Sequence, residues 1–124
     1  MSAALRDDVR TLLAGPNIAH VATVLPDGAP HSVPVWIDVE GDEILLMTGP
    51  GSQKARNLER DGRLALSIVD RDQPFAMASI RGRVARRVEG DAAWAIVDRI
   101  AQKYVGAPYA RDVERIVYVI EQES

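Results

Sequence analysis

The sequence predicts an α+β fold built on a small antiparallel barrel of about six strands, with short helices outside it. The apolar segments are mostly short and are joined by tight turns, which favours hairpin-linked strands. One short helix is inserted between these strands, and other helical patterns flank them. The 124 residues suffice for one domain with a real core, and no linker or internal repeat divides residues 1–124.

The composition narrows the classes of function. The net charge of -3 gives no reason to expect nucleic acid or an anionic membrane as a partner. The chain has no cysteine, which excludes disulfides, thiol catalysis and thiolate metal sites. The first residues include acidic side chains where a signal peptide would be basic, and no apolar run approaches the ~18 residues of a membrane helix. We therefore expect a soluble cytoplasmic protein.

The first part of the chain predicts a helix and two strands. Apolar residues recur at helical spacing over residues 2–14, and a Gly-Pro pair then ends the helix. Residues 17–25 form a predicted strand with two mostly apolar faces, which indicates that both faces are covered. After a hairpin turn, a second strand is predicted over residues 30–39.

This second strand carries unusual side chains on one face. Ser32, Pro34, Trp36 and Asp38 alternate there with apolar residues of the other face. Pro34 has no N–H for a sheet hydrogen bond, so the strand lies at an edge or is locally irregular. Because serine, proline and tryptophan are not typical of a solvent face, the face suits either a subunit interface or the floor of a ligand site.

The rest of the chain supplies four further strands, expected over residues 43–48, 64–70, 75–88 and 113–120. A helix precedes the last strand, and Gly106 ends it. This helix carries an apolar stripe at helical spacing, which we interpret as packing rather than as a cofactor site. The stripe consists of Trp94, Val97, Ala101 and Tyr104.

The long strand over residues 75–88 contains a row of arginines. Gly82 predicts a bend or a bulge within this strand. Arg81, Arg83 and Arg87 are expected to share one of its sides. We interpret the row as a solvated strand face, and an anion groove that contacts a ligand is the alternative.

Residues 45–58 contain the most suggestive local pattern. An apolar strand is followed by a Gly-Pro-Gly turn, and Ser52 is the expected N-cap of a short helix that ends near residues 61–62. Lys54 and Arg56 fall in the first turn of that helix, where the helix dipole already presents positive potential. Cations there are unfavourable unless an anion faces them, so the pattern suits a phosphate site. A plain strand–turn–helix link with solvated basic residues is the alternative.

No other pattern in the chain competes with a phosphate site. The two histidines are His20, expected to be a satisfied core residue, and His31, expected to be exposed after its turn. Neither shows metal-ligand spacing with carboxylates, and the sequence has no nucleophile elbow, P-loop or Rossmann fingerprint. If the protein is an enzyme, a bound cofactor therefore supplies the chemistry.

Three segments follow one another in the chain: DGAPHSVPVW at residues 27–36, TGPGSQKARNL at residues 48–58 and DGRLALS at residues 61–67. In this order they resemble the pyridoxamine 5'-phosphate oxidase-like split-barrel flavoproteins. Within that superfamily, the chain most resembles the small actinobacterial oxidoreductases that use a deazaflavin, coenzyme F-420. The resemblance spans nearly the whole chain. It implies a six-stranded antiparallel split β-barrel with short peripheral helices, a homodimer, and two cofactor sites at the dimer interface.

The resemblance also implies which residues hold the phosphate of the cofactor. In pyridoxamine-phosphate oxidases a Ser-Arg-Lys run at this place grips the flavin phosphate. This chain has Ser52, Gln53 and Lys54 there, so Ser52 and Lys54 match the pattern and Gln53 departs from it. By the same resemblance, Arg56 would supply the missing charge, which would suit the longer anionic tail of the deazaflavin. Thr48 and Gly49 would contact the phosphate linker.

The remaining implied contacts are with the cofactor ring. Ser32, Val33 and Pro34 would line it. From the residues themselves we expect no catalytic side chain and no metal ligand. The chain lacks the C-terminal arginine and tryptophan segment that the oxidase proper uses for its substrate, so vitamin B6 oxidation is not expected.

Three functions follow as hypotheses. The first is transfer of hydride from reduced deazaflavin to a small conjugated organic acceptor. The second is an FMN-binding oxidoreductase of the same fold. The third is a non-catalytic module that binds a cofactor, haem or another tetrapyrrole, in which His20 or His31 would act as a ligand.

Overall fold

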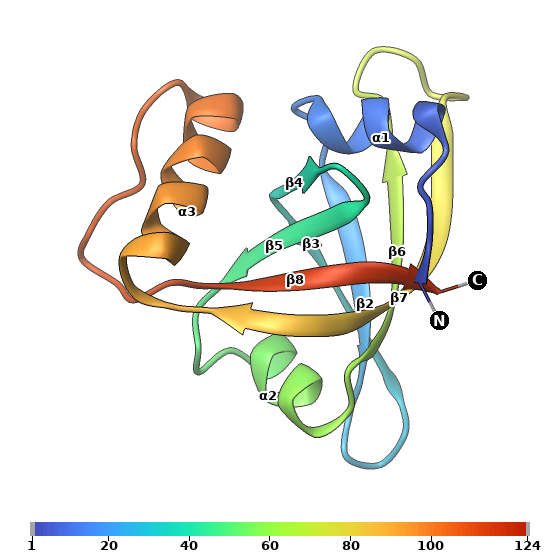
Figure 1. The fold of residues 1–124 in the computed structure, drawn as a ribbon. Helices are drawn as coiled ribbons and strands as arrows, with labels where there is room; N and C mark the ends of the chain where they lie inside the picture. The colour runs from blue at the N-terminus through green and yellow to red at the C-terminus, as the bar shows by residue number, and fades with distance from the viewer. Residues whose placement is uncertain (1, 124) are drawn as a thin grey trace.

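Seven antiparallel strands form the wall of a barrel, in the order β3-β2-β6-β7-β8-β5-β4, and three helices pack around it (Figure 1). The computed structural model describes residues 2–123. Within this range, no helix is both long and apolar enough to cross a membrane. The elements in chain order are β1 (Ser2–Ala3), α1 (Asp7–Ala14), β2 (Ala19–Val24), β3 (Pro30–Val35), β4 (Ile37–Glu40), β5 (Glu43–Thr48), α2 (Gln53–Arg60), β6 (Arg63–Val69), β7 (Met77–Val88), α3 (Gly90–Val105) and β8 (Ile116–Glu123).

One extended segment supplies both edges of the sheet. β3 pairs with β2, β4 pairs with β5, and only Trp36 separates β3 from β4. The predicted single strand over residues 30–39 is therefore wrong, because the chain changes its hydrogen-bonding partner at Trp36. This break, together with the two-residue β1 that pairs with β8, is why the described chain has more strands than the predicted six.

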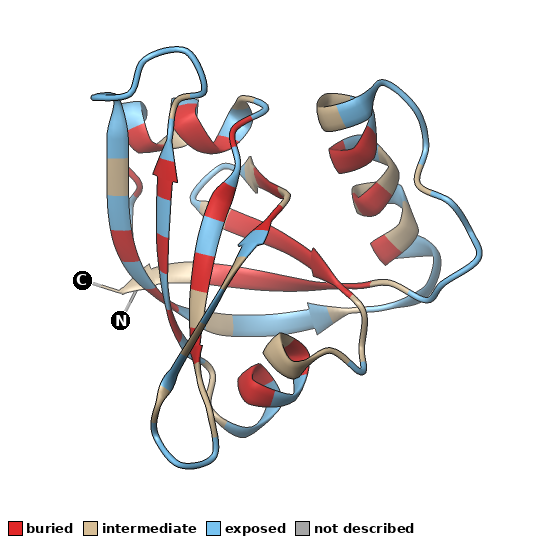
Figure 2. Cartoon of the chain, turned by 180° about the vertical axis from the view of Figure 1, so that it is seen from behind, coloured by how far each residue is buried: buried red, intermediate tan, exposed pale blue. Residues whose placement is uncertain are grey.

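The interior of the barrel is apolar, and helices cover its two ends. α1 contributes Val9, Leu12 and Leu13 to the main core, and α2 contributes Ala55 and Leu58. The two helices lie on opposite sides of the barrel (Figure 1). Side chains from the inner faces of the strands fill the space between them, as the alternation of buried and exposed residues along β6 shows (Figure 2).

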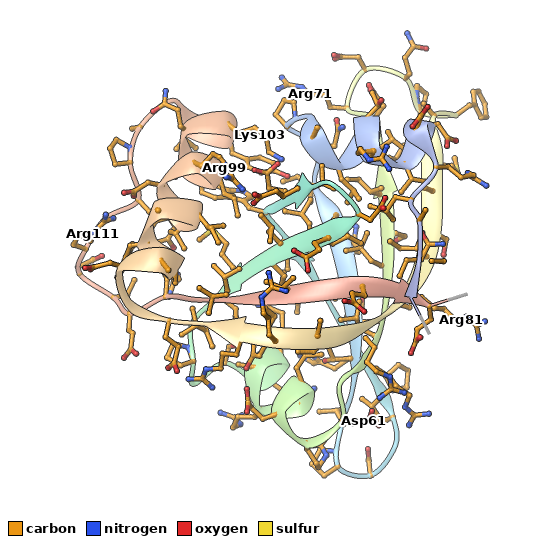
Figure 3. All side chains as sticks on the ribbon, viewed as in Figure 1. Asp61, Arg71, Arg81, Arg99, Lys103 and Arg111 are labelled. Carbon is orange, nitrogen blue, oxygen red and sulfur yellow. The ribbon has the colours of Figure 1, made fainter. Side chains whose placement is uncertain are left out.

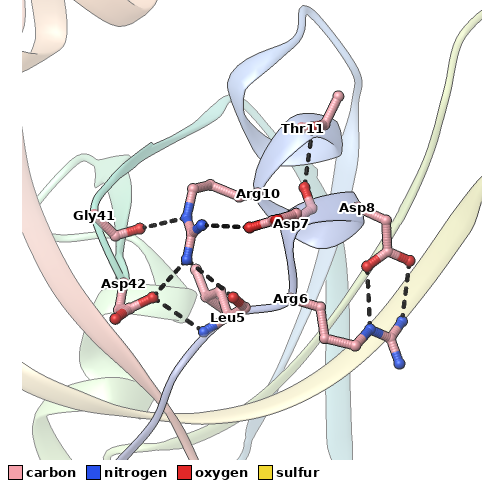
Figure 4. Close-up of polar contacts among 8 residues, drawn as sticks. All are labelled: Leu5, Arg6, Asp7, Asp8, Arg10, Thr11, Gly41 and Asp42. Atoms are coloured by element: carbon pink, nitrogen blue, oxygen red, sulfur yellow. Dashed lines mark hydrogen bonds and ion pairs between the residues drawn. The ribbon is translucent and has the colours of Figure 1, made fainter.

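α1 begins at Asp7, so the helix predicted over residues 2–14 is wrong in its first turn. Residues 2 and 3 pair with β8, and the Leu5 N–H donates to Asp42 Oδ1 at 3.1 Å. Arg10 joins these groups, because its Nη2 donates to Asp42 Oδ1 at 2.7 Å and to the Leu5 carbonyl at 2.9 Å (Figure 4). The backbone before Asp7 thus has partners outside the helix.

β5 and β8 are buried on both faces because α3 packs against the outside of the barrel (Figure 2). Val97 and Ile100 of α3 meet Leu45, Val117 and Val119 in a second core cluster. The predicted stripe is confirmed as packing, since Trp94 and Tyr104 also lie against this cluster. Gly106 ends α3 in the left-handed conformation, with φ of 72°, as expected.

β2 is covered on one face only, contrary to the prediction for residues 17–25. Ala19, Val21 and Thr23 are buried, whereas His20 is exposed and Ile18 just before the strand is 42% exposed. No element of the described chain packs on this outer face. The interpretation of His20 as a satisfied core residue is therefore wrong, because it lies on the uncovered side.

Gly82 does not mark the bulge of β7. It pairs in regular register with both neighbouring strands, and the register shifts between Val84 and Arg86 instead. A Cβ atom at Gly82 would lie 2.8 Å from Ile120 Cγ2 and 3.1 Å from the Glu121 carbonyl oxygen. The close approach of β8 therefore explains this glycine.

The bulge divides the predicted arginine row. Arg83 pairs with Glu121, whereas Arg87, beyond the bulge, pairs with Tyr118, which points to the opposite face of β8. The prediction that Arg87 shares a side with Arg81 and Arg83 is therefore wrong. All three side chains are exposed, in keeping with a solvated surface.

Replacing Gly82 tests the close approach of β7 and β8. Gly82→Ala should lower the free energy of unfolding by about 1–3 kcal/mol, because the methyl group overlaps backbone and side-chain atoms that cannot both withdraw. Chemical denaturation measures this loss. Gly62→Ala is the matched control, since its Cβ would meet no atom closer than 3.7 Å, and equal losses in the two variants would contradict the assignment.

Candidate functional site

A hollow of about 370 Å³ lies where the ends of β3 and β5 meet the start of α2 and the loop before β8. Aromatic and apolar side chains form part of its wall, and two cations lie in it. Its lining consists of Pro34, Val35, Trp36, Met47, Thr48, Gly49, Ser52, Lys54, Tyr109 and Arg115. A concave site with an apolar wall and a few converging polar groups is typical of cofactor pockets.

The start of α2 forms one side of the hollow. Ser52 is the N-cap, as predicted: its Oγ accepts the Ala55 N–H at 3.1 Å and shares a hydrogen bond of 2.9 Å with Thr48 Oγ1. Serine caps a helix in this way because the first-turn N–H groups have no partner within the helix. The cap ties the helix to the end of β5, and so it fixes where Lys54 lies.

Two buried polar contacts hold α2 against the barrel. Asn57, which is fully buried, donates from Nδ2 to Thr23 Oγ1 at 2.9 Å. The Tyr118 hydroxyl donates to Glu59 Oε2 at 2.6 Å, and burial followed by this carboxylate raises the pKa of Tyr118. α2 therefore presents Lys54 from a fixed base.

Lys54 is the unusual cation of the structure. Its side chain is half-buried, and within residues 2–123 it has no carboxylate within ion-pair distance. Burial lowers the pKa of Lys54, and the neighbouring Arg115 charge lowers it further. A partly buried charge without a counter-charge costs free energy, so this arrangement suits an anionic ligand.

Lys103 provides the contrast. It is also half-buried, but its Nζ donates to the carbonyls of Leu13 and Ile37 and lies 3.6 Å from Asp38 Oδ1 (Figure 3). Lys103, which lies in the last turn of α3, is thus held by hydrogen bonds and an ion pair within the protein. Lys54 has no such carbonyl or carboxylate partners within residues 2–123.

Arg115 and Tyr109 lie in the hollow and were not predicted. Arg115 donates from Nε and Nη2 to the Tyr109 hydroxyl at 3.2 and 2.7 Å, and its guanidinium lies 5.0 Å from the centre of the Tyr109 ring. Both residues are distant in sequence from Lys54. The pairing of Thr48 with Ile116 brings them to the glycine turn, and no local motif could have revealed this.

Of the other predicted site residues, some line the hollow and others do not. Pro34 lines the hollow, but Val33 packs against the main core and Ser32 is exposed on the outer face of β3. Gln53 and Arg56 are absent from the lining residues. Their assignment as cofactor contacts stays a prediction, as do those of Ser32 and Val33.

Gln53 and Arg56 support the turn and the helix. Arg56 is exposed and donates to the Gly51 carbonyl and to Gln53 Oε1, each at 2.7 Å. Gln53 in turn donates to Asn57 Oδ1 at 2.9 Å. In this arrangement, Arg115 rather than Arg56 is the second cation beside Lys54.

Neither histidine is among the residues that line the hollow. His31 is half-buried, not exposed as expected, and its Nδ1 is buried without a hydrogen-bond partner among the described residues. His20 lies on the outer face of β2. Among residues 2–123, no group of three or more His, Cys, Asp and Glu side chains could hold a metal ion.

The fold and the hollow together define a small split-barrel protein with a pocket that is lined by two cations. A family model described as pyridoxamine 5'-phosphate oxidase matches residues 5–123. The chain therefore belongs to the pyridoxamine 5'-phosphate oxidase family, and the resemblance drawn from the sequence is confirmed.

Relatives agree with this assignment. The chain is 34% identical over 102 residues to a biliverdin reductase of Mycobacterium tuberculosis that depends on reduced F-420, and the match covers 81% of this chain and 72% of the relative. A solved F-420 reductase is 29% identical with a TM-score of 0.82, over 93% of each chain. A conserved hypothetical protein of M. tuberculosis is 26% identical with a TM-score of 0.78, over 99% of this chain and 83% of its own.

The lowered pKa of Lys54 predicts a pH dependence of anion binding. Lys54 loses its proton at a lower pH than the ordinary value of 10.5, so affinity should fall as the pH rises through that lowered pKa. Sulfate is a suitable probe because its own charge stays constant there, and its affinity should weaken about tenfold.

Lys54→Arg is the control, since arginine keeps its charge over this range. Its sulfate affinity should stay nearly constant with pH. A wild-type affinity that does not fall at alkaline pH would contradict a role for Lys54 in anion binding.

Proposed function

We propose that this protein is an oxidoreductase that binds the deazaflavin coenzyme F-420 and passes hydride from its reduced form to a small conjugated organic acceptor. The observation that carries this proposal is the half-buried Lys54, which has no carboxylate partner and lies beside Arg115 in the hollow. The names of two relatives support the choice of cofactor.

The residues of the hollow fit the cofactor in two parts. Lys54 and Ser52 hold the phosphate, and Thr48 and Gly49 contact its linker. Pro34, together with the aromatic wall, lies along the ring. The reduced cofactor supplies the hydride when it is bound, and the chain binds it, orients its ring and keeps water away.

Trp36 is well placed to form a rigid part of that wall. Its ring stacks on Tyr104 at 5.1 Å between centroids, with 5° between the planes. The Tyr104 hydroxyl donates to the Asn17 carbonyl at 2.6 Å and accepts the Ile37 N–H at 3.2 Å. The same contacts hold the chain at the break between β3 and β4. Tyr104 therefore stabilises both the wall of the pocket and the point where the chain changes its strand partner.

The proposed enzyme is a homodimer whose second copy covers the outer face of the sheet formed by β3, β2, β6 and β7. This face carries exposed apolar side chains near its end, with Val69 39%, Met77 58% and Phe75 93% exposed. Its centre is formed by small residues such as Ala22 and Ala65, which pair with each other. Arg63 and Arg81 flank this centre, and an uncovered face whose side chains are otherwise largely small or apolar is typical of an interface.

The hollow adjoins this face. Pro34 pairs with His20 on β2 and also lines the hollow, so it belongs to both surfaces. A second copy on the outer face would therefore lie beside the cofactor. This continuity supports a cofactor site at the dimer interface.

FMN is the second candidate for the cofactor, because its terminal phosphate would meet the same Lys54 and Ser52. A non-catalytic tetrapyrrole module has less support, since neither histidine lies among the lining residues of the hollow. It would be recognised by tight ligand binding without turnover of any acceptor.

Titration of the purified protein with each cofactor tests the proposal. We expect oxidised F-420 to bind at micromolar concentrations and FMN to bind more weakly. Lys54→Ala should weaken F-420 binding by about 1–3 kcal/mol, the scale of a charge-assisted contact, with little loss of stability.

Arg71→Ala is the control, because Arg71 (labelled in Figure 3) is an exposed cation that is not among the residues lining the hollow. Failure of the wild-type protein to bind F-420 at micromolar concentrations would sink the proposed function. Tight FMN binding with bound flavin absorbance would favour the second candidate.

A charged residue on the outer face tests the dimer. Ala65→Arg should convert the dimer to a monomer, because the added arginine would be buried beside Arg81 and lose its hydration without gaining a partner. Sedimentation velocity measures the change. Ala95→Arg, on the exposed side of α3, should remain dimeric, and a wild-type protein that sediments as a monomer would contradict the proposal.

A further inference from the structure

We propose that Arg115, oriented by Tyr109, is the second cation of the cofactor site and binds the phosphate group together with Lys54. This inference rests on the proposed function, which it extends by assigning a binding residue and a positioning residue. Four observations carry it. Arg115 lies at the glycine turn, and it has N–H donors without acceptors. Neither Arg115 nor Lys54 has a carboxylate partner within residues 2–123, and the group that orients Arg115 is an uncharged phenol.

Arg115 lies directly against the turn after β5. The last pair of the β5–β8 ladder is Thr48 with Ile116, so Gly49 and Arg115 follow at the same level. A Cβ atom on Gly49 would lie 3.1 Å from Arg115 Nη1. Gly49 thus leaves room for the guanidinium, and the cation lies against the glycine turn for which the sequence pattern predicts a phosphate site.

The guanidinium keeps donors free for a ligand. Of the five N–H groups of an arginine, Nε and one on Nη2 donate to the Tyr109 hydroxyl, and one on Nη1 donates to the Glu114 carbonyl at 2.9 Å. One N–H on each terminal nitrogen has no acceptor among residues 2–123. Two such donors match two oxygens of a phosphate.

The charges of the hollow lack a counter-ion. Within residues 2–123, neither Lys54 nor Arg115 has a carboxylate within ion-pair distance. Arg111 on the same loop shows the contrasting case, since its Nη2 lies 2.6 Å from Asp98 Oδ2 (Figure 3). Two adjacent cations repel each other, and an anion between them adds attractions to both that outweigh this repulsion.

Tyr109 orients Arg115 without neutralising it. A carboxylate in its place would cancel the charge of the guanidinium, whereas a phenol oxygen accepts two N–H groups and leaves the charge available. Tyr109 is itself held, because its ring lies against Trp36 and its N–H donates to Asp98 Oδ1 at 3.2 Å. Tyr109 is therefore a positioning residue.

The test compares two ligands that differ only in the phosphate-bearing tail: F-420 and the deazaflavin with a free ribityl alcohol. Arg115→Gln should raise the Kd for F-420 by about 10- to 100-fold, the range expected for a lost charge-assisted contact. The Kd for the phosphate-free deazaflavin should not change. Arg71→Gln, which removes the same charge at an exposed position outside the hollow, should leave both values unchanged.

Two further variants separate binding from folding. Arg115→Lys keeps the charge but loses the two-pronged geometry, so its affinity should lie between wild type and Arg115→Gln. Tyr109→Phe should weaken F-420 binding several-fold in the wild-type background and have no further effect in Arg115→Gln. Wild-type F-420 affinity in Arg115→Gln, or an equal loss for both ligands, would overturn the proposal.

A sulfate titration separates this inference from the proposed function. If the wild-type protein binds no deazaflavin, the proposed function fails, and sulfate then tests the cation pair alone. Weaker sulfate binding in Arg115→Gln than in Arg71→Gln would support the pair. Equal binding in these two variants, or no sulfate binding by the wild-type protein, would overturn it.

Discussion

The antiparallel pairing of β5 with β8 is the interaction on which the rest of the structure depends. The ladder runs from Glu43 with Glu121 to Thr48 with Ile116. One face of these two strands fills the barrel, and the other carries α3, so both core clusters meet on them. The same ladder ends at the glycine turn, where Arg115 comes to lie beside Lys54. The register of this ladder therefore determines both how the two core clusters pack and where the cations of the site lie.

The site differs from the remaining surface in how its charges are balanced. Most of the other arginines lie within ion-pair distance of carboxylates, as Arg86 does with Glu43 at 2.7 Å. In the hollow, two half-buried cations lie side by side. The partners of Arg115 are a phenol and a carbonyl, and Lys54 has no carboxylate partner within residues 2–123. The protein thus tolerates a repulsive arrangement that an anion would relieve, and this is the physical reason to regard the hollow as a binding site.

Much of the fold could be predicted because it depends on local patterns. β5 has the bounds predicted for it, Ser52 caps α2, and α3 packs through its stripe. The break at Trp36 was missed because the alternation of side chains continues on both sides of it. The exposed face of β2 was missed because an apolar pattern does not say what covers it. Arg115 was missed because only the sheet register brings it to the turn.

The most direct test of the central claim is a crystal structure of the protein with F-420. The account predicts the phosphate in the hollow, with its oxygens within hydrogen-bonding distance of Lys54 Nζ and of both terminal nitrogens of Arg115. A phosphate bound elsewhere, with the hollow filled by solvent or by the acceptor, would contradict it.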